Sequence, residues 1–283
     1  MKVKLVGIPS NAGGLYTGTE LTPKIMRQSG IIKKLEEGGF EVKDFGDLQI
    51  PSFLPRHNIA PIRNWPAPRI VWEETLKQSG DWFNGDDFVL ILGGDCSIVT
   101  GTAMRLHEVY GGNSHIVAID AHIDAFMPSP EFCVGAAGLG LGFLIESNPF
   151  ITRLEGFDGG NISIMAYQAL IDVNKAVRLY NLDEIRKEGL KSSVNNMLSA
   201  IPANRKILVH LDLDVIAKSD LHAVYSPSDY GLSLSEIKQL LSEIIKDQRV
   251  VGLEITEFFA LYDGDGSQAQ RVIDIIVSAL RSS

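Results

Sequence analysis

Two short clusters of acidic residues have the residue types and the spacing of a metal site. Asp120, His122 and Asp124 alternate along one segment, and Asp212 and Asp214 alternate along another. Residues two apart on an extended chain point to the same side, so each cluster presents its side chains together. Carboxylates with one imidazole suit divalent cations such as Mn²⁺, with Zn²⁺, Fe²⁺ and Ni²⁺ as competitors. One Asp-x-Asp alone is more often a solvated strand end, but two clusters favour a metal site.

Each cluster ends an apolar run that predicts a buried strand. The strand predicted over 206–211 is almost continuously apolar, as expected when both faces of a parallel sheet are covered. Isolated carboxylates at such strand ends are costly to desolvate, and bound cations offset that cost. Ligands bind at the carboxyl ends of parallel strands, where residues 93–97, Glu254 and Glu257 also fall. We therefore expect four segments to converge on one edge of a sheet.

The elements that must position these residues alternate between short β-branched runs and longer helical patterns. This order predicts a three-layer α/β/α sandwich around a central, mostly parallel sheet. Strands are predicted over 3–8, 40–44, 88–92, 115–119, 161–165, 206–211 and 250–255. Helices are predicted over 23–37, 70–83, 98–109, 182–200, 233–246 and 267–281. The stretch 52–68 is predicted to be a surface loop, and no linker or repeat divides the chain, so we predict one domain over 1–283.

Composition excludes several classes of partner. The chain has 283 residues, of which 45% are hydrophobic and 22% charged, as in ordinary globular proteins. Its formal charge of −9 argues against nucleic acid or an anionic membrane as the main partner. The first apolar run is too short for a signal peptide, and no stretch is long enough to span a bilayer. Two cysteines, Cys96 and Cys133, are too few for a disulfide framework, so we expect a cytoplasmic protein, with a single bridge between them left open.

The stretch Gly93-Gly94-Asp95-Cys96-Ser97 is weaker evidence by itself. It is compatible with a glycine turn that feeds a helix, with Asp95 or Ser97 as a cap and Cys96 as a small buried hydrophobic residue. A thiolate beside divalent cations is strongly stabilised, so Cys96 is also a candidate ligand. Both interpretations stay open from the residues alone.

These segments, in this order and spacing, resemble the arginase/agmatinase/formimidoylglutamase family of ureohydrolases. The family's signatures are Gly-Gly-Asp-His-Ser, Asp-Ala-His-x-Asp and Asp-x-Asp followed by Asp-Pro. The similarity covers nearly the whole chain, from residues 13–23 through Asp44-Phe45-Gly46-Asp47 to the last predicted helix. It implies an arginase-like sandwich around two Mn²⁺ ions that hydrolyses a guanidino or formimino carbon. It also implies a homo-oligomer, a trimer or a hexamer, that acts on a small molecule.

The resemblance implies a ligand set for two metals with six members: Cys96, Asp120, His122, Asp124, Asp212 and Asp214. Asp120 and Asp212 would bridge the two metals. Asp124 would bind the first metal with Cys96, and His122 and Asp214 would complete the second. The resemblance thus assigns a ligand role to every member of both acidic clusters.

Two residues are predicted to be catalytic. Asp124 would orient the attacking water and manage its proton. Glu257 matches the family's glutamate that pairs with a guanidinium, a role that suits a carboxylate because planar N–H forks bind it in bidentate fashion. Without the resemblance, Glu257 would be taken as a solvated carboxylate past a strand. His210 shares the face of Asp212 by parity, and a supporting role behind the ligands and a plain core position are both open.

The chain departs from the family's pattern around the substrate. Cys96 replaces a histidine ligand by a softer, anionic thiolate, which favours Zn²⁺, Fe²⁺ or Ni²⁺ over Mn²⁺. Phe126 and Cys133 stand where arginases have an asparagine and a serine that contact substrate, and Ala137 stands where the family has a proton-shuttling histidine. The ligands are kept while the arginine-reading residues are replaced, so we expect a substrate other than arginine, contacted by Phe126, Cys133 and Glu257.

We therefore predict metal-assisted hydrolysis of a C–N bond in a guanidino, hydroxyguanidino or formimino compound. Ala137 has no titratable group. The leaving group must therefore be protonated by another residue, or its protonated form must be more acidic than an alkyl ammonium, as that of a hydroxylamino nitrogen is. Two alternatives stay open. One is a non-catalytic metal-binding paralogue, which Ala137 and Cys96 favour. The other is a deacylase of the same fold with a single Zn²⁺, which would be indifferent to Glu257→Gln.

Overall fold

The computed structural model describes residues 1–168 and 176–282. Within these ranges, eight strands form one sheet in the order β2-β1-β3-β8-β7-β4-β5-β6, and every neighbouring pair is parallel. The strands are β1 (Lys2–Gly7), β2 (Glu41–Asp47), β3 (Phe88–Leu92), β4 (Ser114–Ile119), β5 (Ile162–Tyr167), β6 (Arg178–Asn181), β7 (Lys206–Asp212) and β8 (Val250–Thr256).

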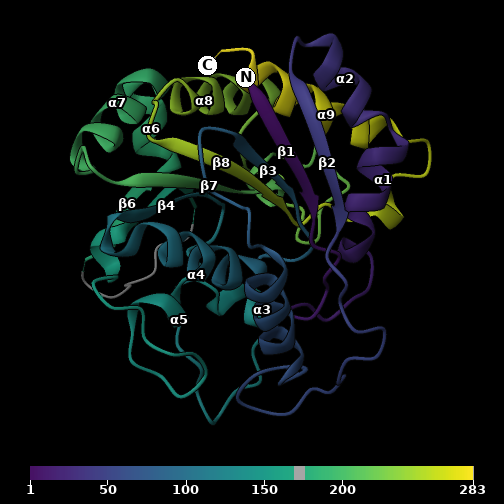
Figure 1. The fold of residues 1–283 in the computed structure, drawn as a ribbon, viewed down its shortest axis with the longest axis vertical. Helices are drawn as coiled ribbons and strands as arrows, with labels where there is room; N and C mark the ends of the chain where they lie inside the picture. Colours follow the sequence, from purple (N-terminus) through teal and green to yellow (C-terminus); the bar gives the residue numbers. More distant parts are fainter. Residues whose placement is uncertain (169–175, 283) are drawn as a thin grey trace.

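Helices cover both faces of this sheet, which confirms the predicted α/β/α sandwich (Figure 1). One face carries α1 (Thr22–Gln28), α2 (Ile31–Glu37), α6 (Leu182–Glu188), α7 (Leu190–Ala200), α8 (Leu234–Ile245) and α9 (Ser267–Leu280). The other face carries α3 (Ala67–Gln78), α4 (Ile98–Tyr110) and α5 (Gly142–Ile145). A buried apolar cluster fills the space on each side of the sheet, so burial on both faces accounts for the nearly continuous apolar runs of the central strands.

Two long helices predicted from the pattern are each divided by a glycine. The helix predicted over 23–37 ends before Gly30, whose φ is 86°, and the one predicted over 182–200 is interrupted at Gly189, whose φ is 90°. These left-handed values are open to glycine without steric cost and stop a helix. The short edge strand β6 has no counterpart among the predicted strands, and its four half-buried residues lack a clear alternation.

The order of the strands decides which loops become neighbours. Strands β3, β8, β7 and β4 lie side by side in the centre of the sheet. In the register, Ile119 is paired with Leu211, and Asp212 with Thr256. All four strands run in the same direction, so the residues that follow them emerge at one edge, as the sequence predicts.

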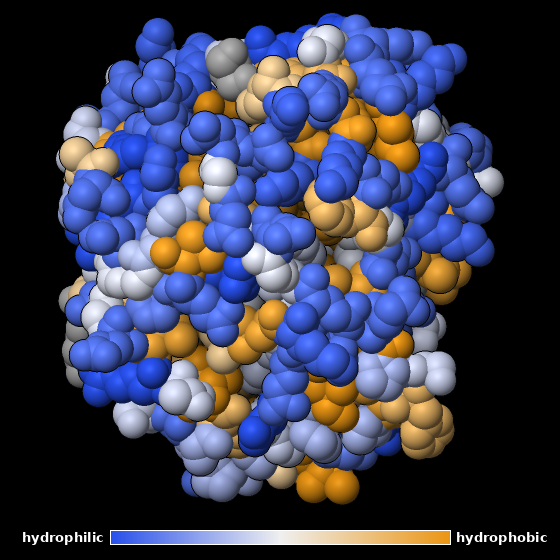
Figure 2. All heavy atoms as spheres, viewed as in Figure 1, coloured by the Kyte–Doolittle hydropathy of each residue, from blue (hydrophilic) through white to orange (hydrophobic). Residues whose placement is uncertain are grey.

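No helix in the described ranges combines the length and the apolar character needed to cross a bilayer. On the face seen in Figure 2, apolar side chains form separate spots among mostly hydrophilic ones. Scattered apolar residues of this kind are normal on a protein surface.

Candidate metal centre

Three of the four central strands, β3, β4 and β7, bring the six predicted ligands to one place. Cys96 follows β3, Asp120 follows β4, and Asp212 ends β7. The ligand atoms of the six predicted residues fall into two groups whose members lie within 4.8 Å of one another: Cys96, Asp120, Asp124 and Asp212 in one, and Asp120, His122 and Asp214 in the other. Asp120 belongs to both groups. A carboxylate shared between two ligand sets is what a bridging ligand requires.

The two acidic clusters are built by turns rather than by extended chain. One oxygen of Asp120 accepts a hydrogen bond from the backbone N–H of His122 at 2.6 Å, and one oxygen of Asp212 accepts from that of Asp214 at 2.8 Å. A single 3₁₀ turn, Leu213–Val215, follows β7. The expectation that alternate residues of an extended chain bring the carboxylates together is therefore wrong, although the residues do meet. Turns leave the second oxygen of each leading aspartate available to the centre.

Two backbone positions in the centre are strained. Asp124 has a φ of 47° and Glu257 has a φ of 62°, in the left-handed region that costs a non-glycine residue of order 1–3 kcal/mol. The Glu257 backbone is held there from both sides, because its N–H donates to Gly94 and its carbonyl accepts from Tyr225. Strain of this kind is concentrated at functional sites, and here it falls on the two residues predicted to be catalytic.

Several buried carboxylate oxygens in and beside the centre have no hydrogen-bond partner. They are Asp120 Oδ2, Asp214 Oδ1, Glu254 Oε2 and Glu257 Oε2. Buried acceptors are nearly always satisfied, and each unsatisfied one costs about 1–3 kcal/mol. Cations placed among these oxygens would remove that cost. The orphaned oxygens and the donor types of the surrounding residues therefore fit divalent metals.

The electrostatics of the cluster lead to the same conclusion. Burial, reinforced by neighbouring carboxylates, raises the pKa values of Asp124, Asp212 and Glu257 well above their usual range. Burial followed by the charge of Asp212 likewise raises the pKa of the Cys96 thiol. The carboxylates of Asp120 and Asp214 raise the pKa of His122 to about 12. Such a site concentrates negative potential, and bound cations would reverse these shifts.

The glycine-rich loop after β3 holds Cys96 in place. Asp95 accepts hydrogen bonds from the N–H of Ser97 at 3.0 Å and from that of Gly13 at 3.2 Å, so it joins this loop to the one after β1. A Cβ on Gly94 would lie 1.8 Å from the carbonyl oxygen of Ser10, so only glycine fits. The Cys96 N–H donates to Glu257 Oε1 at 2.7 Å, which ties the loop to the end of β8.

A cavity of about 200 Å³ opens over the centre. It is lined by His122, Asp124, Ala137, Gly138, Asp212, Asp214, Tyr225, Ser226 and Glu257. Tyr225 and Ser226 were not predicted, because they follow no motif and reach the cavity through an isolated bridge between Val224 and Phe258. The Tyr225 hydroxyl accepts a hydrogen bond from the Leu15 N–H at 2.7 Å, so a loop near the N-terminus helps to position this ring.

Two predicted substrate contacts lie outside this lining. Phe126 is half-buried and packs against an aromatic cluster that includes Trp72 and Phe143. The Cys133 thiol donates to Asn58 Oδ1 at 3.1 Å. Both cysteines of the chain are free, so the disulfide left open by the sequence is absent from the structure. Contact of Phe126 and Cys133 with a substrate stays a prediction.

Fold, ligand cluster and cavity together are those of a metal-dependent hydrolase that acts on C–N bonds. The arginase family model matches residues 1–281, and the chain belongs to that family. Arginase of Staphylococcus aureus (strain MRSA252) is 23% identical over 295 residues, which cover 97% of this chain and 95% of the relative. These findings confirm the predicted family.

Solved structures support the same conclusion for the fold. Arginase from Bacillus subtilis superposes with a TM-score of 0.84 at 22% identity and covers 99% of this chain and 98% of its own. Formimidoylglutamase from Bacillus subtilis superposes with a TM-score of 0.78 at 17% identity and covers 99% and 86%. The low identities show that this chain is a divergent member of the family.

Proposed function

We propose that this chain is a binuclear-metal hydrolase that cleaves a C–N bond of a guanidino, hydroxyguanidino or formimino compound, and that arginine is not its main substrate. One observation carries the proposal. Asp120 is shared by the two groups of predicted ligands and keeps a buried oxygen without a partner, and four of the other ligands line a cavity that Glu257 also lines. Among the relatives of this chain are proteins named arginase and formimidoylglutamase, which supports this range of substrates.

The residues present divide into two metal positions. Cys96, Asp124 and Asp212 would hold the first ion with Asp120, and His122 and Asp214 would hold the second ion with Asp120. Mn²⁺ is the expected ion, with Zn²⁺, Fe²⁺ or Ni²⁺ favoured where the thiolate binds. When bound, these cations supply Lewis acidity that lowers the pKa of water towards neutrality and stabilises developing negative charge.

Two carboxylates perform the remaining tasks. Asp124 lines the cavity, so it can orient the attacking water and accept its proton. Glu257 has one oxygen fixed by the Cys96 N–H, while its other oxygen is buried and without a partner. That free oxygen can accept an N–H of a cationic amidino group, which positions the planar sp² carbon over the ligands.

The rest of the cavity restricts the substrate. Its volume of about 200 Å³ leaves room for a planar amidino group. Ala137 and Gly138 line it without a titratable group, so these two positions cannot protonate an amine leaving group. A leaving nitrogen that needs little protonation is favoured, such as the hydroxylamino nitrogen of a hydroxyguanidino compound. We propose a small molecule as substrate and a cytoplasmic homo-oligomer, a trimer or hexamer, as the working form.

Metal analysis combined with a substrate panel tests this proposal. Purified protein is loaded with Mn²⁺, its metal content is measured, and it is incubated with guanidino, hydroxyguanidino and formimino compounds while urea, hydroxyurea, ammonia or formamide release is monitored. We expect two ions per chain and turnover of at least one compound, with arginine a poor substrate. Two bound ions with no turnover of any compound would instead support a non-catalytic metal-binding paralogue. Amide turnover with one Zn²⁺ would support a deacylase.

A further inference from the structure

We propose that His210 is itself a metal ligand, and that with Cys96 and Asp120 it forms a buried inner position that binds Zn²⁺ in preference to Mn²⁺. This inference rests on the proposed binuclear centre and adds a ligand outside the six predicted ones. It implies a centre that holds two different metals. The sulfur and imidazole ligands belong to the buried inner position, and the outer position beside the cavity is richer in carboxylate ligands.

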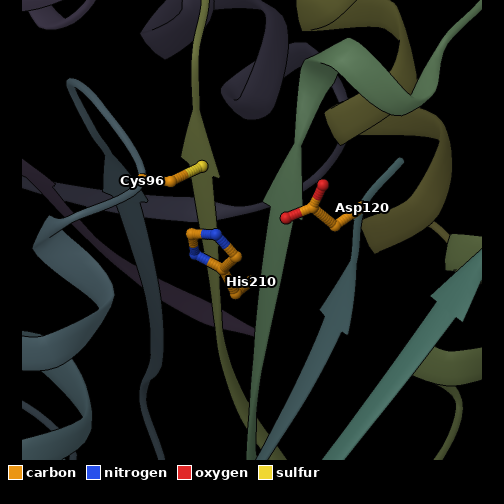
Figure 3. Close-up of side chains that lie close together, drawn as sticks. All are labelled: Cys96, Asp120 and His210. Carbon is orange, nitrogen blue, oxygen red and sulfur yellow. The ribbon is translucent and has the colours of Figure 1, made fainter. Parts of the chain in front are cut away.

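The first support is geometric. The ligand atoms of Cys96, Asp120 and His210 all lie within 4.8 Å of one another. The three side chains come from the ends of β3, β7 and β4, with β8 between β3 and β7. Figure 3 shows the imidazole ring near the Cys96 sulfur, with the Asp120 carboxylate turned toward both. In the register, His210 is paired with Ala118 of β4 and with Glu254 of β8. The ring therefore stands in the middle of the sheet edge, beneath the loops that carry the outer ligands.

The second support is the way the ring is held. His210 Nδ1 and Glu254 Oε1 are 2.7 Å apart, and both side chains are buried. A carboxylate that binds one ring nitrogen fixes the tautomer and the orientation of a metal-binding histidine and makes it a better ligand. With Nδ1 committed to Glu254, Nε2 is the nitrogen left to coordinate an ion. Glu254 therefore acts as a positioning residue for His210.

The third support is an unpartnered oxygen aimed at the same point. Asp120 is 1% exposed, and its Oδ2 has no hydrogen-bond partner. Cys96 is also 1% exposed, and its thiol donates to Asp212 Oδ2 at 2.9 Å. When a cation binds, the thiol loses this proton to solvent and the thiolate becomes a ligand. The same step frees the Asp212 oxygen for the metal.

The donor types decide which ion is preferred. Sulfur, imidazole nitrogen and carboxylate oxygen are the ligands of Zn²⁺, whereas Mn²⁺ prefers carboxylate and water. The outer group of Asp120, His122 and Asp214 contains no sulfur, and His122 is half-exposed with a side-chain exposure of 50%. The outer position therefore suits Mn²⁺ and keeps access to the cavity, while the inner position suits Zn²⁺.

Metal competition in the whole protein tests this assignment. Protein stripped with a chelator receives one equivalent of Zn²⁺ per chain in an excess of Mn²⁺, and its metal content after removal of free ions is measured by mass spectrometry. A parallel titration with Co²⁺ follows the near-ultraviolet thiolate-to-cobalt absorption. We expect one Zn²⁺ and one Mn²⁺ per chain and a thiolate band that saturates with the first equivalent of Co²⁺. Two Mn²⁺ per chain in this competition would overturn the inference.

Variants assign the histidine. His210→Gln should weaken Zn²⁺ binding at least ten-fold, since even the loss of a group behind a ligand costs 10- to 100-fold. The matched control is His115→Gln, because His115 is an equally buried imidazole of the same sheet that bonds to Ser163 instead. It should keep the metal content and the cobalt spectrum of the wild type. Unchanged Zn²⁺ affinity in His210→Gln would refute the inference.

A measurement on the wild type covers the case in which His210→Gln does not fold. Zinc X-ray absorption of the Zn²⁺/Mn²⁺ protein should show one sulfur and one imidazole on zinc, and a zinc shell without imidazole would refute the inference. The outcomes also separate the two proposals. Zinc bound through His210 without turnover of any compound contradicts only the proposed function, whereas turnover with Mn²⁺ in both positions contradicts only the inner zinc position.

Discussion

Removing the metals should reverse the way in which stability depends on pH. In the metal-free protein, burial and neighbouring charges raise the pKa values of Asp124, Asp212, Asp214 and Glu257. A carboxyl group with a raised native pKa keeps a proton that the unfolded chain has already lost. The free energy of unfolding therefore falls as pH rises from the unfolded value, near 4, toward the native one. Cations would lower these pKa values, and the metal-loaded protein would instead lose stability on acidification as protons displace the ions.

The size of the effect follows from the number of protons retained. Each proton that the native metal-free centre holds and the unfolded chain lacks costs about 1.4 kcal/mol of stability per pH unit. One retained proton among four closely packed carboxyl groups then gives a loss of about 3 kcal/mol between pH 5 and pH 7. The raised pKa of His122 also lowers the free energy of unfolding as pH rises above the unfolded pKa of histidine. Its side chain is half-exposed and screened by solvent, so this contribution is not part of the loss of about 3 kcal/mol.

Urea denaturation at pH 5, 6 and 7, with and without bound Mn²⁺, measures this effect. His115, whose pKa is lowered to about 3 by burial, titrates in the opposite sense below pH 6.5. It is common to both forms and cancels in their difference. Asp212→Asn should flatten the slope of the metal-free protein. Asp247→Asn is the control, because a hydrogen bond from Arg249 lowers the pKa of Asp247 and moves its titration below this range. Metal-free protein whose stability rises with pH in parallel with the loaded form would refute the reasoning.

Three further substitutions have defined outcomes. Asp120→Asn should reduce the metal content from two ions per chain, and an unchanged stoichiometry in mass spectrometry would exclude a bridging role. Glu257→Gln should lower kcat/KM for a cationic substrate, by an amount that corresponds to a loss of about 2–4 kcal/mol of transition-state stabilisation. Steady-state kinetics measure this loss, and an unchanged kcat/KM would exclude a guanidino group. Glu236→Gln should cost about 1–2 kcal/mol in urea denaturation at neutral pH, because the Glu236 carboxylate accepts hydrogen bonds from Arg186 and from the N–H of Ser233, the residue whose side chain caps α8. Since Arg186 lowers the pKa of Glu236 to about 2, this difference should vanish as pH falls from 4.5 toward 2.

The position of the centre could be predicted because it depends on topology rather than on side-chain detail. Polar residues that follow apolar runs must leave a parallel sheet at the same edge, whatever path the loops take. Cys96, Asp120 and Asp212 satisfy that condition, and they meet even though their turns differ from the extended chain expected. His210 could be placed by parity on the face of Asp212, but its distance to Cys96 depends on the register between β7 and β8 and not on spacing along the chain.

The cavity could not be predicted to the same depth. Tyr225 enters it through one isolated bridge and is held by the loop that contains Leu15, more than two hundred positions away in the sequence. Such contacts between loops leave no periodic signal. The breaks at Gly30 and Gly189 are different, because a glycine within a helical pattern is a readable stop signal. The apolar helical pattern continues on both sides of Gly30 and Gly189, so it predicts one helix where the glycine favours two.

The charge of the centre connects its metals to its substrate. Ionised Cys96 and the four aspartates are five negative ligands, and two divalent cations bring four positive charges, so the loaded centre keeps a net negative charge before Glu257 is counted. A thiolate in place of a neutral imidazole creates this imbalance. An anionic group entering the cavity would be repelled, while an amidinium would be attracted by Glu257 and the centre together. A metal-loaded centre with this charge would therefore favour a cationic carbon centre over an anionic one, which is what the proposed function requires of Cys96 and Glu257.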